Sequence, residues 1–327
     1  MGAARLVIPA LPGIGDMLMA HGLIQILRQQ DADAPIDLIA SPNSAPVARL
    51  LPEIRDVFEL RASSGEMRPV DFLATVRQAR QRRYAAAYSV HINPKLTLIP
   101  WLAGVPRRLG FERARHSATL FTQALPSISP PSHFAREMAT LAKPGETDFD
   151  LPSPRLEFGS KELHKLPKDL QDLAAGGRLV ALCPGGVTSR HKRWPAAHYA
   201  RLAAWLADQG FAVAILGNAA DADEARQIAA QAKHPAIHDL AGKAKLVDAL
   251  KLLSRCKALV ANDTGIMHAG AALGIVTLGI FTITNPHMFG PLGPRAHHIA
   301  PARPSCHPDA ISAKAVIAKL ETLLPQD

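Results

Sequence analysis

One pattern recurs along the chain: a short apolar run, a glycine-rich or polar turn, and then apolar residues at helical spacing. The apolar runs that we expect to be buried strands lie at 5–9, 36–40, 85–90, 178–186, 212–217, 257–262 and 276–281. The helices are expected at about 16–29, 46–51, 196–208, 221–232, after Gly265 and at 311–324. Strands that are apolar on both faces are typical of parallel sheets covered by helices. The sequence therefore predicts an α/β protein with doubly wound parallel sheets.

The pattern occurs twice, and each half opens with a strand and a glycine loop. A proline-rich and charged stretch over 151–170 is typical of a linker between two domains. We therefore expect a first Rossmann-like domain over 1–160 and a second over 161–327. The last helix, 311–324, could pack on either half.

Hydropathy and cysteine usage limit where such a chain can work. No run of eighteen apolar residues is present, so we expect no membrane-spanning helix. The apolar start is broken by prolines, glycines and Asp16 and lacks the charged lead and the cleavage site of a signal peptide. The three cysteines, Cys183, Cys256 and Cys306, are scattered and odd in number. A cytoplasmic protein without disulfides is expected.

The net charge of +9 is unevenly spread. Nine basic residues and one acid, Glu112, lie between positions 77 and 115: Arg77, Arg80, Arg82, Arg83, Lys95, Arg107, Arg108, Arg113 and Arg115. The stretch is either a solvated face or a docking surface for an anionic partner. Aromatic residues make up only 5% of the chain and do not alternate with the basic ones. An anionic lipid or glycolipid therefore fits better than nucleic acid.

The carboxyl ends of the strands should carry the chemistry, because ligands bind there in doubly wound sheets. In the first loop, Gly13 and Gly15 allow close approach of a ligand, and Asp16 starts a helix. Leu18 stands where a dinucleotide fingerprint needs its third glycine, so a nucleotide-dependent dehydrogenase is disfavoured. Tight-turn glycines and a capping Asp are the structural alternative.

Two loops of the second half suit a phosphorylated ligand. After the strand at 178–186, Thr188 and Ser189 offer hydroxyl groups and Lys192 a positive charge. After the strand at 212–217, Asp221 stands where a carboxylate can accept two ribose hydroxyls. A polar surface loop and an acidic first helical turn are the alternatives.

A third loop, Asn262-Asp263-Thr264-Gly265, ends an apolar strand and opens a helix of small residues. If Asp263 caps this helix, the backbone N–H groups after it and the helix dipole form an anion site. Gly265 leaves room for a phosphate, and His268 is close enough to donate to the same anion. A plain cap and a buried structural histidine are the alternative for each residue alone.

Taken together, the loops resemble glycosyltransferase family 9, the ADP-heptose:lipopolysaccharide heptosyltransferases. The segments that carry the resemblance are 13–30, 82–111, 183–221 and 260–281, which include the Gly-Asp loop, Lys-x-Trp-Pro and Asp-Thr-Gly-x-x-His. Gly15-Asp16-Met17 and Asn93-Pro94-Lys95 are most similar to the type II members. The resemblance covers nearly the whole chain.

The resemblance implies a GT-B fold, in which two Rossmann-like domains face each other across a cleft. It implies an inverting, metal-independent transfer to the inner core of lipopolysaccharide, by an enzyme bound peripherally to the inner face of the inner membrane. The acceptor would bind the first domain and the ADP-sugar the second. Asp16 would be the catalytic base, with Gly15, Lys95, Arg113 and Arg115 on the acceptor. The donor would be held by Thr188, Ser189, Lys192, Asp221, Asp263, Thr264, Gly265 and His268.

The sequence also departs from the family pattern. Thr282-Ile283-Thr284 follows the strand at 276–281, where the family usually has Gly-Pro-Thr. The histidine-rich segment 297–309 has metal-ligand residue types, but its spacing fits no zinc pattern, and we expect no metal. Three alternatives stay open: another nucleotide-sugar donor or acceptor, a nucleotide-sugar epimerase or hydrolase, and a non-catalytic anion-binding module.

Overall fold

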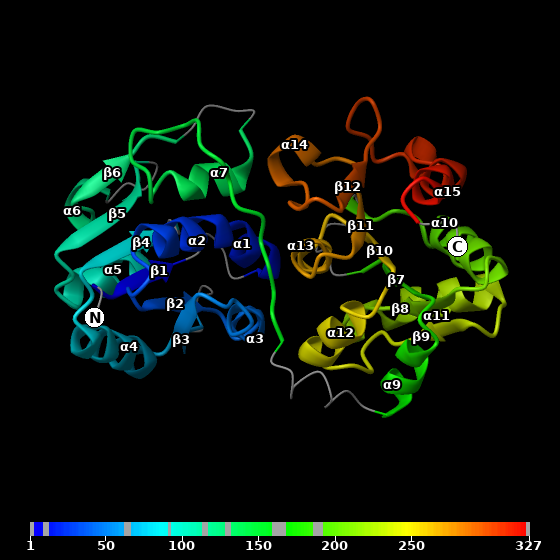
Figure 1. Cartoon of the computed structure of the whole chain (residues 1–327), viewed down its shortest axis with the longest axis horizontal. Helices are drawn as coiled ribbons and strands as arrows, with labels where there is room; N and C mark the ends of the chain where they lie inside the picture. The colour runs from blue at the N-terminus through cyan, green and yellow to red at the C-terminus, as the bar shows by residue number, and fades with distance from the viewer. Residues whose placement is uncertain are drawn as a thin grey trace. The chain divides into compact units, whose positions relative to one another are not determined.

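The computed structural model describes residues 3–8, 13–61, 67–90, 93–112, 117–127, 132–158, 168–185 and 192–324. The chain divides into two compact units, Met1–Leu156 and Glu157–Asp327. Figure 1 shows each unit as a sheet flanked by helices. Within the described residues, none of the helices combines the length and the apolar character needed to cross a lipid bilayer.

The sheet of the first unit has six parallel strands in the order β3-β2-β1-β4-β5-β6. The strands are β1 (Arg5–Ile8), β2 (Ile36–Ala40), β3 (Ile54–Glu59), β4 (Ala86–Ser89), β5 (Arg107–Phe111) and β6 (Gln123–Leu125). The central strand β1 pairs with β2 through Val7 and Leu38 and with β4 through Val7 and Tyr88. Its residues 6–8 are buried, as expected for a strand that helices cover on both faces.

The helices of this unit are α1 (Ile14–Met19), α2 (His21–Gln30), α3 (Ala45–Ala48), α4 (Pro69–Arg82), α5 (Pro94–Leu102), α6 (Ser117–Leu120) and α7 (Phe134–Ala139). The single helix expected at 16–29 is wrong, because the chain turns at Ala20 and makes two helices. Gly22 follows the break, and a Cβ there would lie 2.8 Å from a methyl carbon of Leu151. This glycine therefore lets the last segment of the unit lie against the start of α2.

The second unit contains a parallel sheet in the order β12-β11-β10-β7-β8-β9. Its strands are β7 (Leu179–Cys183), β8 (Ala212–Ile215), β9 (Ile237–Asp239), β10 (Ala258–Asn262), β11 (Val276–Ile280) and β12 (Ala296–Ile299). Its helices are α9 (Lys168–Ala175), α10 (Ala196–Asp208), η2 (Ala219–Asp221), α11 (Ala222–Ala232), α12 (Leu246–Leu253), α13 (Gly265–Ala272), α14 (Pro286–Phe289), η3 (Pro308–Ala310) and α15 (Ala313–Glu321). The order of the strands reverses between β7 and β10, so this is the switch point where a ligand is expected. The α/β class with doubly wound parallel sheets is confirmed.

The last helix packs within the second unit. Val316 and Leu320 of α15 belong to the same buried cluster as Leu202 and Leu206 of α10. The indole N–H of Trp194 donates a 2.7 Å hydrogen bond to the carbonyl of Ile311, just before α15. The end of the described chain is therefore tied to the loop that leads into α10.

Candidate active site

A buried amide organises the switch point of the second unit. Asn262, the last residue of β10, donates through Nδ2 to the carbonyl of Pro184, just after β7. Its Oδ1 accepts from the backbone N–H of Trp194 at 3.2 Å and from the hydroxyl of Tyr199 at 3.1 Å. A side chain with no exposed surface thus joins the ends of two strands and the start of α10. This explains why residues far apart in the sequence meet here.

Lys192, Asp263 and Thr284 meet directly beside this amide. The ammonium of Lys192 lies 2.8 Å from Oδ2 of Asp263. The hydroxyl of Thr284 donates to the same oxygen, also at 2.8 Å. Two donors on one carboxylate oxygen hold the Asp263 side chain in a defined orientation, and the carboxylate in turn holds the Lys192 ammonium beside it.

Asp263 was expected to cap the following helix, and this is wrong. Helix α13 begins at Gly265, and Thr264 is its N-cap residue. The Asp263 carboxylate does not turn back to the helix because it is bound to Lys192 and Thr284. The cap is therefore one residue later than the sequence suggests.

The cap residue itself has an unused hydroxyl. Thr264 is 8% exposed, and its Oγ1 is buried with no hydrogen-bond partner among the residues that the structure describes. A buried hydroxyl without a partner is destabilising, and a ligand oxygen can remove that cost by pairing with it. Thr264 stands at the positive end of the α13 dipole, where anions are favoured. The start of α13 therefore has two features that suit a phosphate.

Small residues let α13 lie close to its sheet, as predicted. A Cβ on Gly270 would lie 2.6 Å from Cδ2 of Leu259 and 2.8 Å from Oγ1 of Thr277. Only a residue without a side chain fits at that point. His268 is 6% exposed and lies in the first half of this helix, one turn after its start. Its contact with a ligand stays a prediction.

The carboxylate of Asp221 has structural partners. It is 2% exposed, its Oδ2 accepts from the backbone N–H of Asn218 at 3.0 Å, and the two residues form a capping box. Its Oδ1 lies 3.6 Å from the guanidinium of Arg193, which also donates to Glu224 at 2.6 Å. Asp221 therefore supports the loop after β8, and its predicted contact with a ribose stays a prediction.

The charges of Arg193 and Asp221 affect the pKa values of neighbouring groups. Burial raises the pKa of Glu224, Arg193 opposes this rise, and the charge of Asp221 adds to it. Burial, followed by the charge of Asp221, raises the pKa of the Cys183 thiol to about 12. Cys183 is therefore an inert core residue rather than a nucleophile.

The first unit presents Asp16 at the carboxyl end of its sheet. Helix α1 has Gly13 as its N-cap, and Asp16 lies half-buried in its first turn, together with Gly15. A Cβ on Gly13 would lie 2.8 Å from Oδ2 of Asp16. The carboxylate therefore folds back over the start of its own helix, and glycine at position 13 leaves the space for it. Asp16 was expected to start the helix, but α1 begins two residues earlier, at Ile14.

Lys95 lies in the first turn of α5. Its backbone N–H donates a 3.0 Å hydrogen bond to the capping side chain of Asn93, and its own side chain is exposed. The four remaining predicted site residues, Thr188, Ser189, Arg113 and Arg115, lie outside the described residues.

Several members of the basic stretch serve the fold. Arg108 donates to the carbonyls of Leu120 and Val105 at 2.7 and 2.6 Å, and Arg80 donates to that of Leu102 at 2.7 Å. Arg107 and Arg108 both lie at the start of strand β5. This part of the basic stretch is structural.

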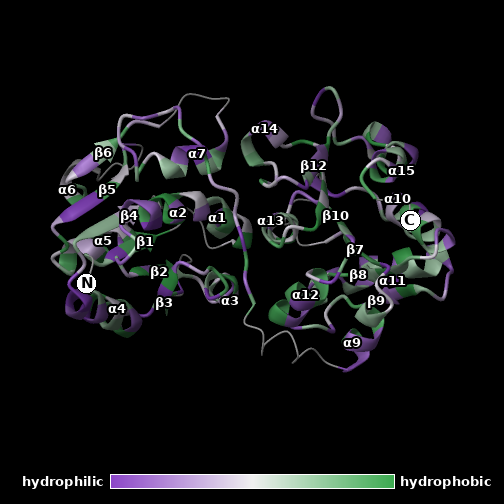
Figure 2. Cartoon of the chain, in the orientation of Figure 1, coloured by the Kyte–Doolittle hydropathy of each residue, from purple (hydrophilic) through white to green (hydrophobic). Residues whose placement is uncertain are grey.

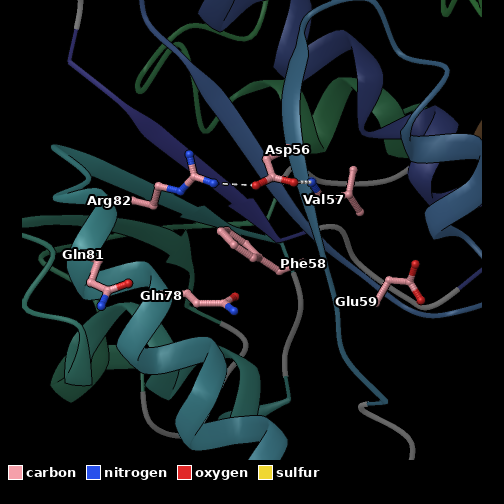
Figure 3. A pocket seen from close by; sticks show the side chains of 7 residues that line it. All are labelled: Asp56, Val57, Phe58, Glu59, Gln78, Gln81 and Arg82. Carbon is pink, nitrogen blue, oxygen red and sulfur yellow. Dashed lines mark hydrogen bonds and ion pairs between the residues drawn. The ribbon is translucent and has the colours of Figure 1, made fainter.

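A polar hollow of about 490 Å³ lies between β3 and α4. Figure 3 shows Gln78 and Gln81 on α4 and the ion pair of Arg82 with Asp56 across the hollow, at 2.5 Å. None of the predicted site residues that the structure describes lines it. Over the described ranges, the structure brings no group of three or more His, Cys, Asp or Glu residues together to hold a metal ion.

Known proteins are similar to this chain in both sequence and fold. The family model for glycosyltransferase family 9 (heptosyltransferase) matches residues 72–315. Lipopolysaccharide heptosyltransferase 2 of Escherichia coli K12 is 30% identical over 295 residues, which cover 88% of this chain and 85% of that protein. Lipooligosaccharide heptosyltransferase 2 of Haemophilus influenzae is 29% identical over 293 residues, or 86% and 84% of the two chains. The structure of Escherichia coli ADP-heptose LPS heptosyltransferase II aligns with a TM-score of 0.83 and 26% identity, covering 98% of each chain.

The two Rossmann-like units and these matches define a glycosyltransferase of the GT-B fold. The chain belongs to glycosyltransferase family 9, the heptosyltransferases. The resemblance inferred from the sequence is therefore confirmed.

Proposed function

We propose that the protein transfers heptose from ADP-heptose to the inner core of lipopolysaccharide, with inversion at the anomeric carbon and without a metal or other cofactor. The observation that carries the proposal is the group of Lys192, Asp263 and Thr284 beside the start of α13. It supplies a cation and a free helix end where a nucleoside diphosphate can bind. The names of the curated relatives support the sugar and the acceptor.

In the second unit the diphosphate would lie at the start of α13. The bond between the anomeric carbon and the β-phosphate oxygen breaks, so negative charge grows on the departing ADP. Lys192, the hydroxyl of Thr264 and the backbone N–H groups of α13 are suited to stabilise that charge. Thr188, Ser189, Asp221, Gly265 and His268 complete the proposed donor site.

In the first unit Asp16 would act as the base. The acceptor hydroxyl forms the new bond to the anomeric carbon, and its proton passes to the Asp16 carboxylate. Gly15, Lys95, Arg113 and Arg115 are the proposed acceptor contacts. The acceptor is an anionic glycolipid, so the enzyme would work as a peripheral protein at the inner face of the inner membrane. The first domain would take the acceptor and the second the donor, with the boundary near residue 160.

A mass-spectrometric assay tests the proposal. Purified protein is incubated with ADP-heptose and truncated core acceptors, and with other nucleotide sugars in parallel. Addition of one heptose to an acceptor, with release of one ADP, is expected. Transfer from a different nucleotide sugar would show that the donor is not ADP-heptose. Turnover of the donor without an acceptor would indicate an epimerase or hydrolase instead of a transferase.

A further inference from the structure

Large apolar side chains are exposed at three places in the described residues. They are Val70 (64% exposed), Leu73 (62%) and Trp101 (46%). All three lie on two helices of the first unit, α4 and α5. Single exposed apolar residues are common, but their restriction to one pair of neighbouring helices points to a surface that binds something.

The spacing along α4 places its apolar residues away from the core. Thr75 and Ala79 are buried on the inner face of the helix. Val70, Leu73 and Arg77 are spaced by three and four residues, so they share one face, and all three are exposed. Figure 2 shows that the hydrophobic residues of α4 lie mainly in its first half and the hydrophilic ones in its second half. At about 1.5 Å per residue, the helix offers a face about 21 Å long.

Helix α5 extends this face sideways. The guanidinium of Arg80 donates a 2.7 Å hydrogen bond to the carbonyl of Leu102 at the end of α5. Leu96 and Ile99 of α5 are buried in the same core cluster against which Val76 of α4 packs. The two helices lie side by side in Figure 1. The exposed Trp101 therefore lies near the C-terminal end of α4, and Val70 and Leu73 lie near its start. We name the exposed face of these two neighbouring helices the α4–α5 surface.

The charge of this surface is positive. Arg68 and Arg82 are paired with Asp71 and Asp56. Three further cations are exposed without an ion pair to the described residues: Arg77, Arg83 and Lys95. Helix α5 has no acidic residue. An anionic surface would be attracted to this face over about a Debye length, roughly 8–10 Å near physiological ionic strength.

We propose that the α4–α5 surface docks the protein on an anionic phospholipid bilayer. Trp is favoured at the boundary between lipid and water, and shallow insertion of a few apolar side chains among basic ones is the usual chemistry of interfacial helices. Three scattered apolar side chains are too few for the core of a stable dimer, which needs about 1,200 Å² or more. A second copy of the chain is therefore the weaker fit.

The placement of the surface adds a reason. In parallel α/β units each helix begins at the carboxyl end of the sheet, so Val70, Leu73 and Lys95 lie toward the edge where α1 presents Asp16. Docking would bring that edge close to a lipid-anchored acceptor. In this respect the inference rests on the proposed function, but binding to lipid can be measured without any turnover.

Vesicle flotation tests the proposal with the full chain. Wild-type protein should float with vesicles that contain phosphatidylglycerol and should not float with pure phosphatidylcholine. The variant Val70→Ser/Leu73→Ser/Trp101→Ser should lose this binding by about tenfold or more. Arg77→Gln/Arg83→Gln should weaken it and flatten its salt dependence. The matched control Arg201→Gln/Lys314→Gln removes two exposed cations of the second unit and should bind as the wild type does.

Activity measurements separate this proposal from the proposed reaction. The apolar triple variant should transfer sugar to a soluble, deacylated acceptor at the wild-type rate, and about tenfold more slowly to an acceptor embedded in anionic vesicles. Thermal unfolding at the wild-type temperature would show that the variant is folded. Unchanged vesicle binding by the folded variant overturns the proposal. A loss of dimers in solution with unchanged vesicle binding assigns the surface to a second copy and overturns it equally. Absence of transfer by the wild type, with normal flotation, contradicts the proposed function alone.

Discussion

The hydroxyl of Thr284 donates to the carboxylate oxygen of Asp263 that also contacts Lys192. Thr284 lies in the segment 282–284, which departs in sequence from the family pattern. Among the described residues, two groups donate to the Asp263 carboxylate. A diphosphate would attract the Lys192 ammonium, and Thr284 would then keep the carboxylate oriented and hydrogen-bonded. We therefore predict that Thr284 is a positioning residue that acts through Asp263.

Replacement of Thr284 by Val should lower kcat/KM for the ADP-sugar by about tenfold, because a hydrogen bond to a charged group contributes roughly 1.5–3 kcal/mol. Thr284→Ser keeps the hydroxyl and should recover most of the loss. Ile283→Val in the same loop is the control. Equal kinetics for the Val and Ser variants would show that the hydroxyl has no role.

Lys192→Ala and His268→Ala should each reduce turnover more than they weaken ADP binding. Their positive charge or proton would act on a leaving group that is most anionic in the transition state. Steady-state kinetics and calorimetry with ADP measure the two effects separately. A loss confined to ADP affinity would assign these residues to ground-state binding only.

Asp16→Asn should leave ADP affinity nearly unchanged and cut transfer by about a hundredfold or more, the usual contribution of a positioned base. Asn has almost the same shape as Asp but cannot take the proton from the acceptor. The measurement is single-turnover transfer, with calorimetry to verify the donor site. A folded variant with near-normal turnover would reject the role of Asp16.

An ion pair of the buried Glu53 carboxylate should make the stability of the first unit depend on pH. Glu53 accepts from Nε2 of His21 at 2.7 Å and from the guanidinium of Arg155 at 2.7 Å. The backbone N–H of Arg155 donates to Nδ1 of the same ring, so Nε2 carries the proton. Burial alone raises the pKa of Glu53, but these hydrogen bonds outweigh it and lower the pKa from 4.5 to about 2.

A carboxyl group whose pKa is lower in the folded protein than in the unfolded one stabilises the fold at pH values above its unfolded pKa. This contribution is lost as the pH falls toward the folded pKa. The contribution, on the order of 3 kcal/mol, should be complete above about pH 4.5 and disappear toward pH 2. Urea unfolding at pH 7, 4 and 3 measures it. Glu53→Gln should be less stable than the wild type at pH 7, and the difference should shrink in acid. A constant difference would mean that another group carries the pH dependence.

The apolar pattern predicts the seven strands that are buried along nearly their whole length, because a fully buried strand is apolar at every position. The other five strands of the described residues, β3, β5, β6, β9 and β12, have half-buried or exposed positions and were not predicted. The run 212–217 contains β8, and the run 257–262 contains β10. Helix α10 occupies the expected residues, Ala196–Asp208. Helices α4 and α5 were not predicted. Six of the 14 residues of α4 have charged or amide side chains, and some of its apolar residues face outward.

The side-chain partners at the crevice could not be read from the sequence. Asn262 and Pro184 are 78 residues apart, and Lys192 and Asp263 are 71 apart. Helical or strand periodicity says nothing about such pairs, because they depend on the order of the strands in the sheet. The amide at the end of an otherwise apolar strand was the one available signal for Asn262. Asp263 appeared free to cap α13 only because Lys192 and Thr284 were not known to be its neighbours.

Gly185 lies two residues after the end of β7 and against Asp221. A Cβ on Gly185 would be 2.0 Å from Cγ and 2.1 Å from Oδ1 of this carboxyl group. Substitutions at positions 185 and 221 should therefore be coupled in evolution. Alanine at 185 is excluded while Asp221 keeps its place, and the loss of Asp221 removes the cap on which the loop after β8 depends. Any homologue with a larger residue at 185 should also have a rebuilt loop after β8, so the two changes should be inherited together.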